Sequence, residues 1–244
     1  MTYKTKAIIL RSIKYGETSL VVTAFTELFG IQAYLVSGVR SAAKTGSKAI
    51  LYQPASLLEM EVYHNELKSM HRIKESNRSF LYKNILSDVI KNSIAIFMVE
   101  LLHKTLRQPE QNSELFYFCE DALIKLDEAP PDVTANFALY FILQLSHFFG
   151  FRINDHNSPE GDFYLDLEEG NFTKCQPAHQ YFLLPEDACT TSELLKVMQP
   201  HELSQLKLNR VKRRLLLLKY IEYYQLHIQD FGQMKTLAVM EGVL

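Results

Sequence analysis

The segment at residues 37–48 (SGVRSAAKTGSK) combines three cations with glycine, serine and threonine, a composition that suits the binding of an anion. A nucleotide-binding phosphate loop has the pattern G-x-x-x-x-G-K-[ST], in which the lysine follows the second glycine directly. Here Ser47 separates Gly46 from Lys48, and no buried strand leading into a helix surrounds the segment. The pattern is not matched, so the sequence argues against a phosphate loop.

A metal site is the second chemistry to consider, because His156, Cys175, His179 and Cys189 lie in one stretch of the chain. A structural zinc site needs four nitrogen or sulfur ligands, usually in close pairs such as C-x-x-C. The chain has no C-x-x-C. Loop histidines and small buried thiols are therefore the favoured interpretation, with a zinc site in this stretch as a remote alternative.

Nucleophilic catalysis has little support in the sequence. The chain has no G-x-S-x-G motif, no cysteine in a glycine-rich basic stretch, and no acidic pair beside a loop histidine. His103, His147 and His227 lie between apolar neighbours in predicted helices, which is typical of ordinary, partly buried residues. We therefore expect neither an enzyme nor a cofactor.

Positive charge is concentrated in the N-terminal third, although the formal net charge of the 244 residues is only -2. Residues 1–80 contain 11 Lys and Arg against 6 Asp and Glu, and the remainder contains 15 against 22. Such asymmetry favours a polyanionic partner for the first part of the chain, although chance variation in surface charge is an equally simple explanation.

The basic residues of this part fall at predicted strand ends and in the 37–48 segment, with two tyrosines nearby. In an oligonucleotide-binding (OB) barrel, cationic loops hold phosphates and aromatic rings stack on bases. The alternative is a loop that is merely solvated. We predict that the following residues contact DNA: Arg11, Lys14, Tyr15, Tyr34, Arg40, Lys44 and Lys48.

A second basic cluster lies in the segment LKLNRVKRRLLLLKY. Lys207, Arg210 and Arg214 are spaced i, i+3 and i+7, so a helix would place them on one face, with Arg213 beside them. Such a stripe is usually a solvated face. The alternative is an extension of a DNA path or a grip on an acidic partner segment.

The first 75 residues read as short strands, and their spacing favours a five-stranded OB barrel. In the second and fourth strands, alternation predicts that Leu20, Val22 and Ala24, and likewise Leu58, Met60 and Val62, share one face. The predicted strands are residues 4–11, 19–26, 31–36, 56–63 and 67–74.

Helical spacing begins near Ser79 and predicts an all-α second part. The sequence indicates an OB domain at 1–78 and a helical domain at 79–244, with an irregular insert at about 151–190 that contains at most one small hairpin. Asp88 is a plausible N-cap inside the first helix, and Asp132 or Thr134 caps a later one. The predicted helices are 79–107, 113–128, one ending at Gly150, 192–198, 203–228 and 234–240.

The compartment is predicted from two absences in the sequence. Three scattered cysteines do not make a disulfide framework, and the N-terminus lacks the apolar core of a signal peptide. The apolar stretch at 135–151 is interrupted by polar residues and is shorter than the roughly 20 residues a membrane span needs. We expect a cytoplasmic, nucleoid-associated protein with no membrane contact.

The run AIILRSIKYGETSLVVTAFTELFGIQAYLVSGVRS, residues 7–41, resembles the start of the RecO family of bacterial DNA repair proteins. That family shows a strand ending in Leu-Arg, a Gly-Glu turn, a Thr-x-x-x-Gly turn and a Gly-x-Arg loop. This chain matches these features in order, at Leu10-Arg11, Gly16-Glu17, Thr26 to Gly30, and Gly38 to Arg40. The resemblance is specific over about 75 residues and weaker across the helical remainder, where Phe149-Gly150-Phe151 resembles a helix end of the family.

The resemblance implies an OB-fold domain, a helical domain and a function in DNA repair and recombination. It implies binding of single-stranded and double-stranded DNA, annealing of complementary strands, and a place in the RecFOR pathway. There the partners are RecR, the acidic C-terminal tail of single-strand-binding protein (SSB) and, indirectly, RecA. Many members carry a four-cysteine zinc site in the insert, whereas only Cys175 and Cys189 stand there in this chain.

We therefore expect that the metal is lost and that packing of aromatic side chains in the insert replaces it. Those side chains are Phe163, Tyr164, Phe172, Tyr181 and Phe182. The main hypothesis is a non-enzymatic recombination mediator. The alternative is an adaptor whose OB barrel binds a protein partner without binding DNA directly.

Overall fold

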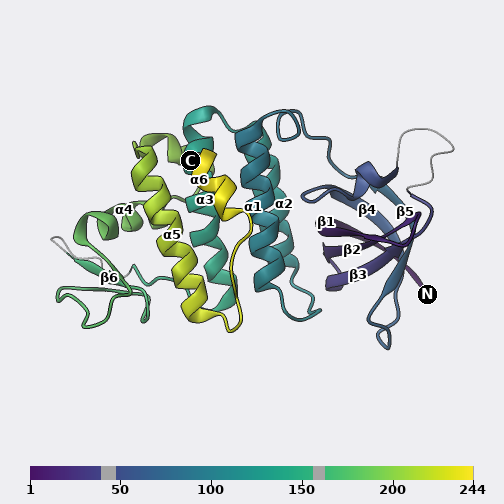
Figure 1. Ribbon diagram of the computed structural model, residues 1–244, viewed down its shortest axis with the longest axis horizontal. Coiled ribbons are helices and arrows are strands. Elements are labelled where there is room, and N and C mark those ends of the chain that lie inside the picture. The colour runs from purple at the N-terminus through teal and green to yellow at the C-terminus, as the bar shows by residue number, and fades with distance from the viewer. Residues whose placement is uncertain (40–47, 156–162, 244) are drawn as a thin grey trace. The chain divides into compact units, whose positions relative to one another are not determined.

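The structure is a computed structural model that describes residues 1–39, 48–155 and 163–243. It contains two compact units, Met1–Asp127 and Glu128–Leu244. The first holds a five-stranded closed barrel and the second is mainly helical, which confirms the predicted fold class (Figure 1). The expected boundary between 78 and 79 falls where the last barrel strand ends. It stays a prediction, because two helices pack on the barrel within the first unit.

The strands close the barrel in the order β1-β2-β3-β5-β4. Every neighbouring pair is antiparallel except β3 and β5, which are parallel and share only two residue pairs, Tyr34 with His71 and Leu35 with Arg72. The β3–β5 seam is thus the shortest pairing in the barrel. The strands are β1 (Thr2–Tyr15), β2 (Ser19–Thr26), β3 (Gly30–Val36), β4 (Leu57–Tyr63) and β5 (His71–Arg78).

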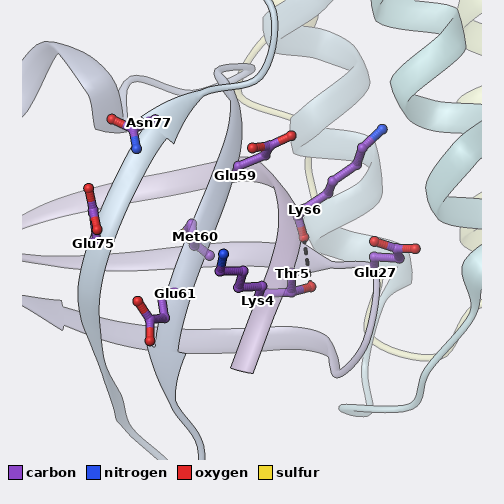
Figure 2. A pocket seen from close by; sticks show the side chains of 9 residues that line it. All are labelled: Lys4, Thr5, Lys6, Glu27, Glu59, Met60, Glu61, Glu75 and Asn77. Carbon is purple, nitrogen blue, oxygen red and sulfur yellow. Dashed lines mark hydrogen bonds between the residues drawn. The ribbon is translucent and has the colours of Figure 1, made fainter. Parts of the chain in front are cut away.

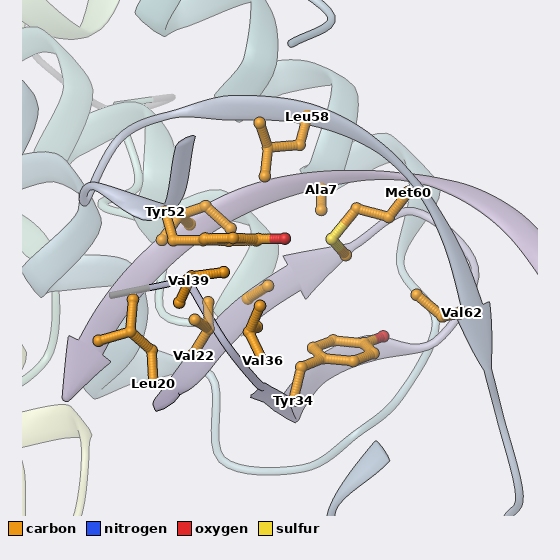
Figure 3. Packing of buried hydrophobic residues seen from close by; sticks show 12 residues of the cluster. Ala7, Leu20, Val22, Tyr34, Val36, Val39, Tyr52, Leu58, Met60 and Val62 are labelled. Atoms are coloured by element: carbon orange, nitrogen blue, oxygen red, sulfur yellow. The ribbon is translucent and has the colours of Figure 1, made fainter. Parts of the chain in front are cut away.

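Alternating side chains fill the barrel, as Figure 3 shows. The inward positions predicted for β2 and β4 are confirmed, because both sets of residues belong to the buried cluster. The short 3-10 helix η1 (Lys48–Tyr52) follows the 37–48 segment, and Tyr52 from it packs into the same core. The helix η1 therefore contributes to the core of the barrel.

The fifth strand begins four residues later than predicted. The side-chain oxygen of Asn65 accepts a hydrogen bond from the backbone N–H of Leu67, and the carbonyl of Asn65 accepts one from Lys68. These bonds form a turn that keeps residues 64–70 out of the sheet, because an Asn side chain readily substitutes for a backbone partner. The apolar residues Leu67 and Met70 consequently lie in a loop.

Gly30 is required by the turn between β2 and β3. Its φ is +62°, which favours glycine, and a Cβ atom there would lie 2.2 Å from the carbonyl oxygen of Glu110. Thr26 closes the same turn: its hydroxyl donates to the carbonyl of Gly30 and accepts from the N–H of Phe29. These contacts explain the Thr-x-x-x-Gly pattern physically.

Two helices, α1 (Val89–Thr105) and α2 (Ser113–Glu128), pack on the barrel within the first unit (Figure 1). Phe25 of β2 meets Phe116 of α2 with ring centroids 5.5 Å apart. Residues 79–88 are not helical, contrary to the prediction. Asp88 caps α1 instead, its side chain accepting bonds from the N–H groups of Ile90 and Lys91.

The carboxylate of Asp127, at the end of α2, holds the segment before α1. It accepts backbone N–H bonds of 2.8 Å from Lys83, Asn84 and Ile85, and the ammonium of Lys91 donates to the Asp127 carbonyl. Asp127 is fully buried. Burial opposes its ionisation, but the three N–H groups and the Lys91 charge win and lower its pKa.

In the second unit, α3 (Pro131–Ser146) is almost entirely buried. The hydroxyl of Tyr224 donates to the carbonyl of Ile142, and the amide of Asn136 donates to the carbonyl of Leu206, so side chains tie later segments to α3. The other elements are η2 (His147–Phe149), β6 (Tyr164–Asp166), β7 (Asn171–Thr173), β8 (Phe182–Leu183), α4 (Pro185–Lys196), η3 (Pro200–Gln205), α5 (Arg210–His227) and α6 (Leu237–Val243).

Several expected element bounds in this unit are wrong. Pro130 is the N-cap of α3 with Pro131 as its first residue, so neither Asp132 nor Thr134 caps it. Likewise α4 begins at Pro185, not at residue 192, and α6 lies three residues later than predicted. The insert holds one hairpin, β6–β7, as expected, with β8 as a third strand. Among the described helices, none is long and apolar enough to cross a membrane.

Replacement of Asp127 by alanine should strongly destabilise the protein. The change leaves three N–H groups, of which that of Ile85 is buried, without their acceptor, and this costs about 3 kcal/mol of unfolding free energy. Asp121→Ala is the matched control, because Asp121 lies on the same helix in an exposed i,i+4 pair with Lys125. Urea unfolding followed by circular dichroism measures both, and equal losses would contradict the role of Asp127.

Acid should weaken the barrel through His71. The ring is 4% exposed, and its Nε2 lies 3.0 Å from Oε1 of Gln32, whose amide is oriented by a bond to the carbonyl of Phe29. Burial, with help from the nearby charges of His64 and Lys68, lowers the pKa of His71. His71 therefore binds a proton more tightly in the unfolded chain than in the folded protein. The free energy of unfolding consequently falls as the pH drops below about 6.5.

Urea unfolding at about pH 7.5 and about pH 5.5 checks this expectation. His71→Asn should lose part of the difference between the two pH values. It should retain the rest, because burial lowers the pKa of His103 and of His147 as well. An unchanged pH dependence in this variant would overturn the assignment.

Candidate nucleic-acid interface

Strand register brings one row of outward side chains across all five strands of the barrel. Cross-strand partners share a face of a sheet. Ile13 pairs with Val21, Val21 with Leu35, Leu35 with Arg72, and Arg72 with Tyr63. Arg72 is exposed, and Ile13 and Tyr63 are about half exposed, so this row faces outward.

A neighbouring row continues the same surface. Arg11 pairs with Thr23 and Thr23 pairs with Ala33, while Tyr15 stands opposite Ser19 at the end of the hairpin. Arg11 is exposed and Tyr15 is 58% exposed. We call this surface the cationic face; it comprises Arg11, Ile13, Tyr15, Val21, Thr23, Ala33, Leu35, Tyr63 and Arg72.

The cationic face is hollowed over β2 and β3. A cavity of about 600 Å³ lies on Thr23, Ile31 and Ala33. Its walls are the 64–71 segment, with Lys68, and the connection between α1 and α2, with Arg107. The β2–β3 face bordered by the β4–β5 loop is the surface on which OB folds bind oligonucleotides.

Arg11 lies close to the end of α1. Burial, together with the positive charges of Arg11 and Lys104, lowers the pKa of His103. His103 is consequently neutral near pH 7, and the charges that act on it are those of Arg11 and Lys104, opposed by the single carboxylate of Glu100. The corner is positive, which suits a phosphate group.

Lys14 faces away from Arg11, because alternate residues of a strand point to opposite sides. It pairs with the inward-facing Leu20, whose next partner is Val36 at the end of β3. Lys14 thus lies at the barrel end from which residues 37–48 depart. Arg40 and Lys44 lie outside the described residues, and Lys48 begins η1.

The prediction that Tyr34 stacks on a base is wrong. Its ring is 0% exposed and lies inside the barrel with Val36, Met60 and Val62 (Figure 3). Burial raises the pKa of its hydroxyl. Position 34 is an inward position of β3, so the ring is part of the core.

The outer side of β1, β4 and β5 has the opposite charge. Lys4 pairs with Glu61 and Glu61 with Glu75. A cavity of about 520 Å³ there is lined by four glutamates, at 27, 59, 61 and 75, against Lys4 and Lys6 (Figure 2). Lys6 is paired with Glu120 at 2.9 Å and Lys74 with Glu61 at 2.8 Å. This glutamate face repels a polyanion, which leaves the cationic face as the candidate interface.

The second basic cluster is not a single helix face. Asn209 is the N-cap of α5, and its side chain accepts a hydrogen bond from the N–H of Lys212. Lys207 therefore precedes the helix, and the prediction that it shares a helix face with Arg210 and Arg214 is wrong. The remaining cations are engaged. Arg210 donates to the carbonyl of Gly242, Arg213 donates to the carbonyl of Leu208, and Arg214 lies 3.5 Å from Glu241.

The insert shows no metal cluster within the described residues, and His156 lies outside them. Cys175 and Cys189 are exposed and free. His179 lies 3.2 Å from Asp166 and accepts a bond from the N–H of Tyr181. Of the aromatic residues expected to pack here, Tyr164 and Phe182 meet edge to face at 5.7 Å.

Sequence reasoning missed Tyr63, Lys68 and Arg72. Tyr63 and Arg72 reach the cationic face, and Lys68 reaches its hollow, only because β5 closes the barrel against β3, a long-range pairing that no local pattern reveals. The cations themselves were visible in the N-terminal charge excess. A prediction in which the fifth strand began at His71 would have placed Lys68 in the preceding loop and the side chain of Arg72 on the outside of the barrel.

A closed five-stranded barrel with an oligonucleotide-binding type of face defines the class of protein, an OB-fold protein joined to a helical domain. Two family models then match the chain: "Recombination protein O N terminal" over residues 1–79 and "Recombination protein O C terminal" over residues 86–236. The chain belongs to the recombination protein O (RecO) family, whose members act in DNA repair. The resemblance seen in residues 7–41 is confirmed.

Relatives match over their whole lengths. A DNA repair protein RecO of Phocaeicola vulgatus is 33% identical, covering 99% of this chain and 98% of the relative. One of Bacteroides fragilis is 34% identical, with the same coverage. One of Flavobacterium psychrophilum is 34% identical, covering 100% of this chain and 99% of the relative.

Removal of the Arg11 charge should raise the pKa of His103. The pKa should stay below its ordinary value, because burial persists in Arg11→Ala. NMR titration of the histidine ring protons measures the change, and Arg72→Ala is the control because Arg72 does not act on His103. An unmoved His103 pKa in Arg11→Ala would contradict the placement of Arg11 beside α1.

Proposed function

We propose that this chain is a non-enzymatic DNA repair and recombination mediator that binds single-stranded and double-stranded DNA through its barrel. The observation that carries the proposal is the separation of charge between the two faces of the barrel. The cationic face carries Arg11 and Arg72 with Tyr15 and Tyr63, whereas on the glutamate face four carboxylates outnumber Lys4, Lys6 and Lys74. Cations for phosphates and rings for bases are what single-strand binding requires.

Annealing of complementary strands follows from the same chemistry and needs no catalytic group. Cations that neutralise phosphates reduce the repulsion between two strands, and base pairing supplies the free energy. Phosphate neutralisation releases counterions, so affinity falls steeply with salt. The relatives named DNA repair protein RecO support this function.

In the cell the proposed role is to help RecA replace SSB on gapped DNA, together with RecR. The helical unit offers a surface for the acidic, apolar-ended tail of SSB. Val211, Leu215 and Leu218 are exposed on α5 at i, i+4 and i+7, and the exposed Arg214 lies beside them. An apolar stripe next to a cation suits such a tail, which would compete with Glu241 for Arg214. A protein with this role acts at the nucleoid.

A protein-interaction adaptor is the second candidate. It is favoured by the apolar character of the outward row, in which Ile13, Val21 and Leu35 are partly exposed. An adaptor would bind a protein partner there and would show no salt-sensitive affinity for DNA. The two candidates therefore differ in one measurable property.

Salt-titrated binding of a fluorescent single strand distinguishes them. We expect log affinity to fall linearly with log salt, and the triple variant Arg40→Ala, Lys44→Ala, Lys48→Ala to flatten that slope by about 2, since each phosphate contributes roughly 0.7. Addition of an SSB tail peptide tests the α5 surface in the same assay.

The matched control removes three lysines outside the proposed interface, in the triple variant Lys4→Ala, Lys74→Ala, Lys125→Ala. It loses the same charge and should keep the wild-type slope. An equal slope in all three proteins would refute the DNA-contact assignment of residues 40–48. Salt-insensitive or absent binding by the wild type would favour the adaptor.

A further inference from the structure

The loop between β4 and β5, residues 64–70, forms a ridge between two hollows of the barrel surface. One hollow, of about 600 Å³, lies over Thr23 and Ala33 on the cationic face. The other, of about 840 Å³, lies over Tyr3 of β1 and Tyr63 of β4. The residues common to both are His64, Glu66, Leu67, Lys68 and His71.

The base of the ridge is anchored by stacked rings. His64 stacks on Phe29 with ring centroids 3.9 Å apart, and on the buried His71 at 4.5 Å. Tyr3 meets the Phe29 ring edge to face at 5.4 Å. The two bonds to Asn65 then fix the turn above. These contacts attach the base of the loop to the barrel.

The tip of the ridge is apolar. Leu67 is 94% exposed. The bond that Leu67 makes to Asn65 uses its backbone N–H, so the turn does not require an apolar side chain at this position. Met70, on the flank, is 42% exposed. Proteins that open or kink nucleic acid insert such side chains between bases, where leucine replaces a stacking partner.

Cations line both sides of the tip. Lys68 borders the two hollows, Arg107 lies in the first and Arg72 in the second, against the single carboxylate of Glu66 that both share. The second hollow also exposes the rings of Tyr3 and Tyr63. Each hollow therefore offers what an unpaired strand needs, positive charge for phosphates and apolar or aromatic surface for bases.

We propose that residues 64–70 are a strand-dividing wedge, which receives one DNA strand in each hollow and inserts Leu67 into the last base pair of the fork, where it separates the two bases. The inference builds on the proposed DNA binding and specifies where a junction sits. In the annealing direction, the two strands approach on opposite sides of the ridge and pair beyond Leu67. One chain then holds both strands of the product.

A forked DNA with two unpaired arms tests the wedge. The base analogue 2-aminopurine, placed in the last pair of the fork, brightens when it is unstacked. Wild-type protein should increase its fluorescence, and Leu67→Ser should reduce that increase at least about fivefold, because the apolar side chain that separates the last pair is lost. Affinity for a plain single strand should change less than about twofold, since the phosphate contacts remain.

Leu81→Ser is the matched control, because Leu81 is also highly exposed and lies in the same unit, outside both hollows. Leu67→Met should retain the fluorescence increase, because the side chain stays long and apolar. An undiminished increase in Leu67→Ser, or an equal reduction in Leu81→Ser, overturns the wedge while single-strand binding stands. Absence of DNA binding by the wild type overturns the proposed function as well.

Discussion

Closure of the barrel depends on the two residue pairs that join β3 to β5. Every other seam of the barrel is longer and antiparallel. These two pairs bury Tyr34 and His71 on the inside and bring Leu35 beside Arg72 on the outside. The outward row, the burial of the His71 ring and the position of the 64–70 loop all follow from this one seam.

The outer surface of this barrel differs in charge from one side to the other, because the strand register decides which charged side chains lie next to each other. The register sets lysines of β1 opposite glutamates of β4, and arginine and small or apolar residues across β1, β2 and β3. The net charge of the whole chain is close to zero, so attraction of an anion depends on which side it meets. The direction from which an anion is attracted is therefore a property of the barrel.

Local pattern predicted much of the fold and less of the interface. The strand at 19–26 was predicted with its observed bounds, because alternation and flanking turns are local signals. The fifth strand was misplaced, because Leu67 and Met70 look like strand residues and the Asn65 turn overrides them. Tyr15 and Tyr34 looked equivalent in sequence, and only the inward register of β3 separates them.

The contact between Gly30 and Glu110 restricts how this chain can vary. The backbone between α1 and α2 lies so close to the β2–β3 turn that a methyl group has no room. An insertion near residue 110 would push the backbone of this connection into the β2–β3 turn, just as a side chain at position 30 would clash with the carbonyl of Glu110. Across homologues, these two distant places should therefore be conserved together, with a constant loop length wherever the glycine is kept.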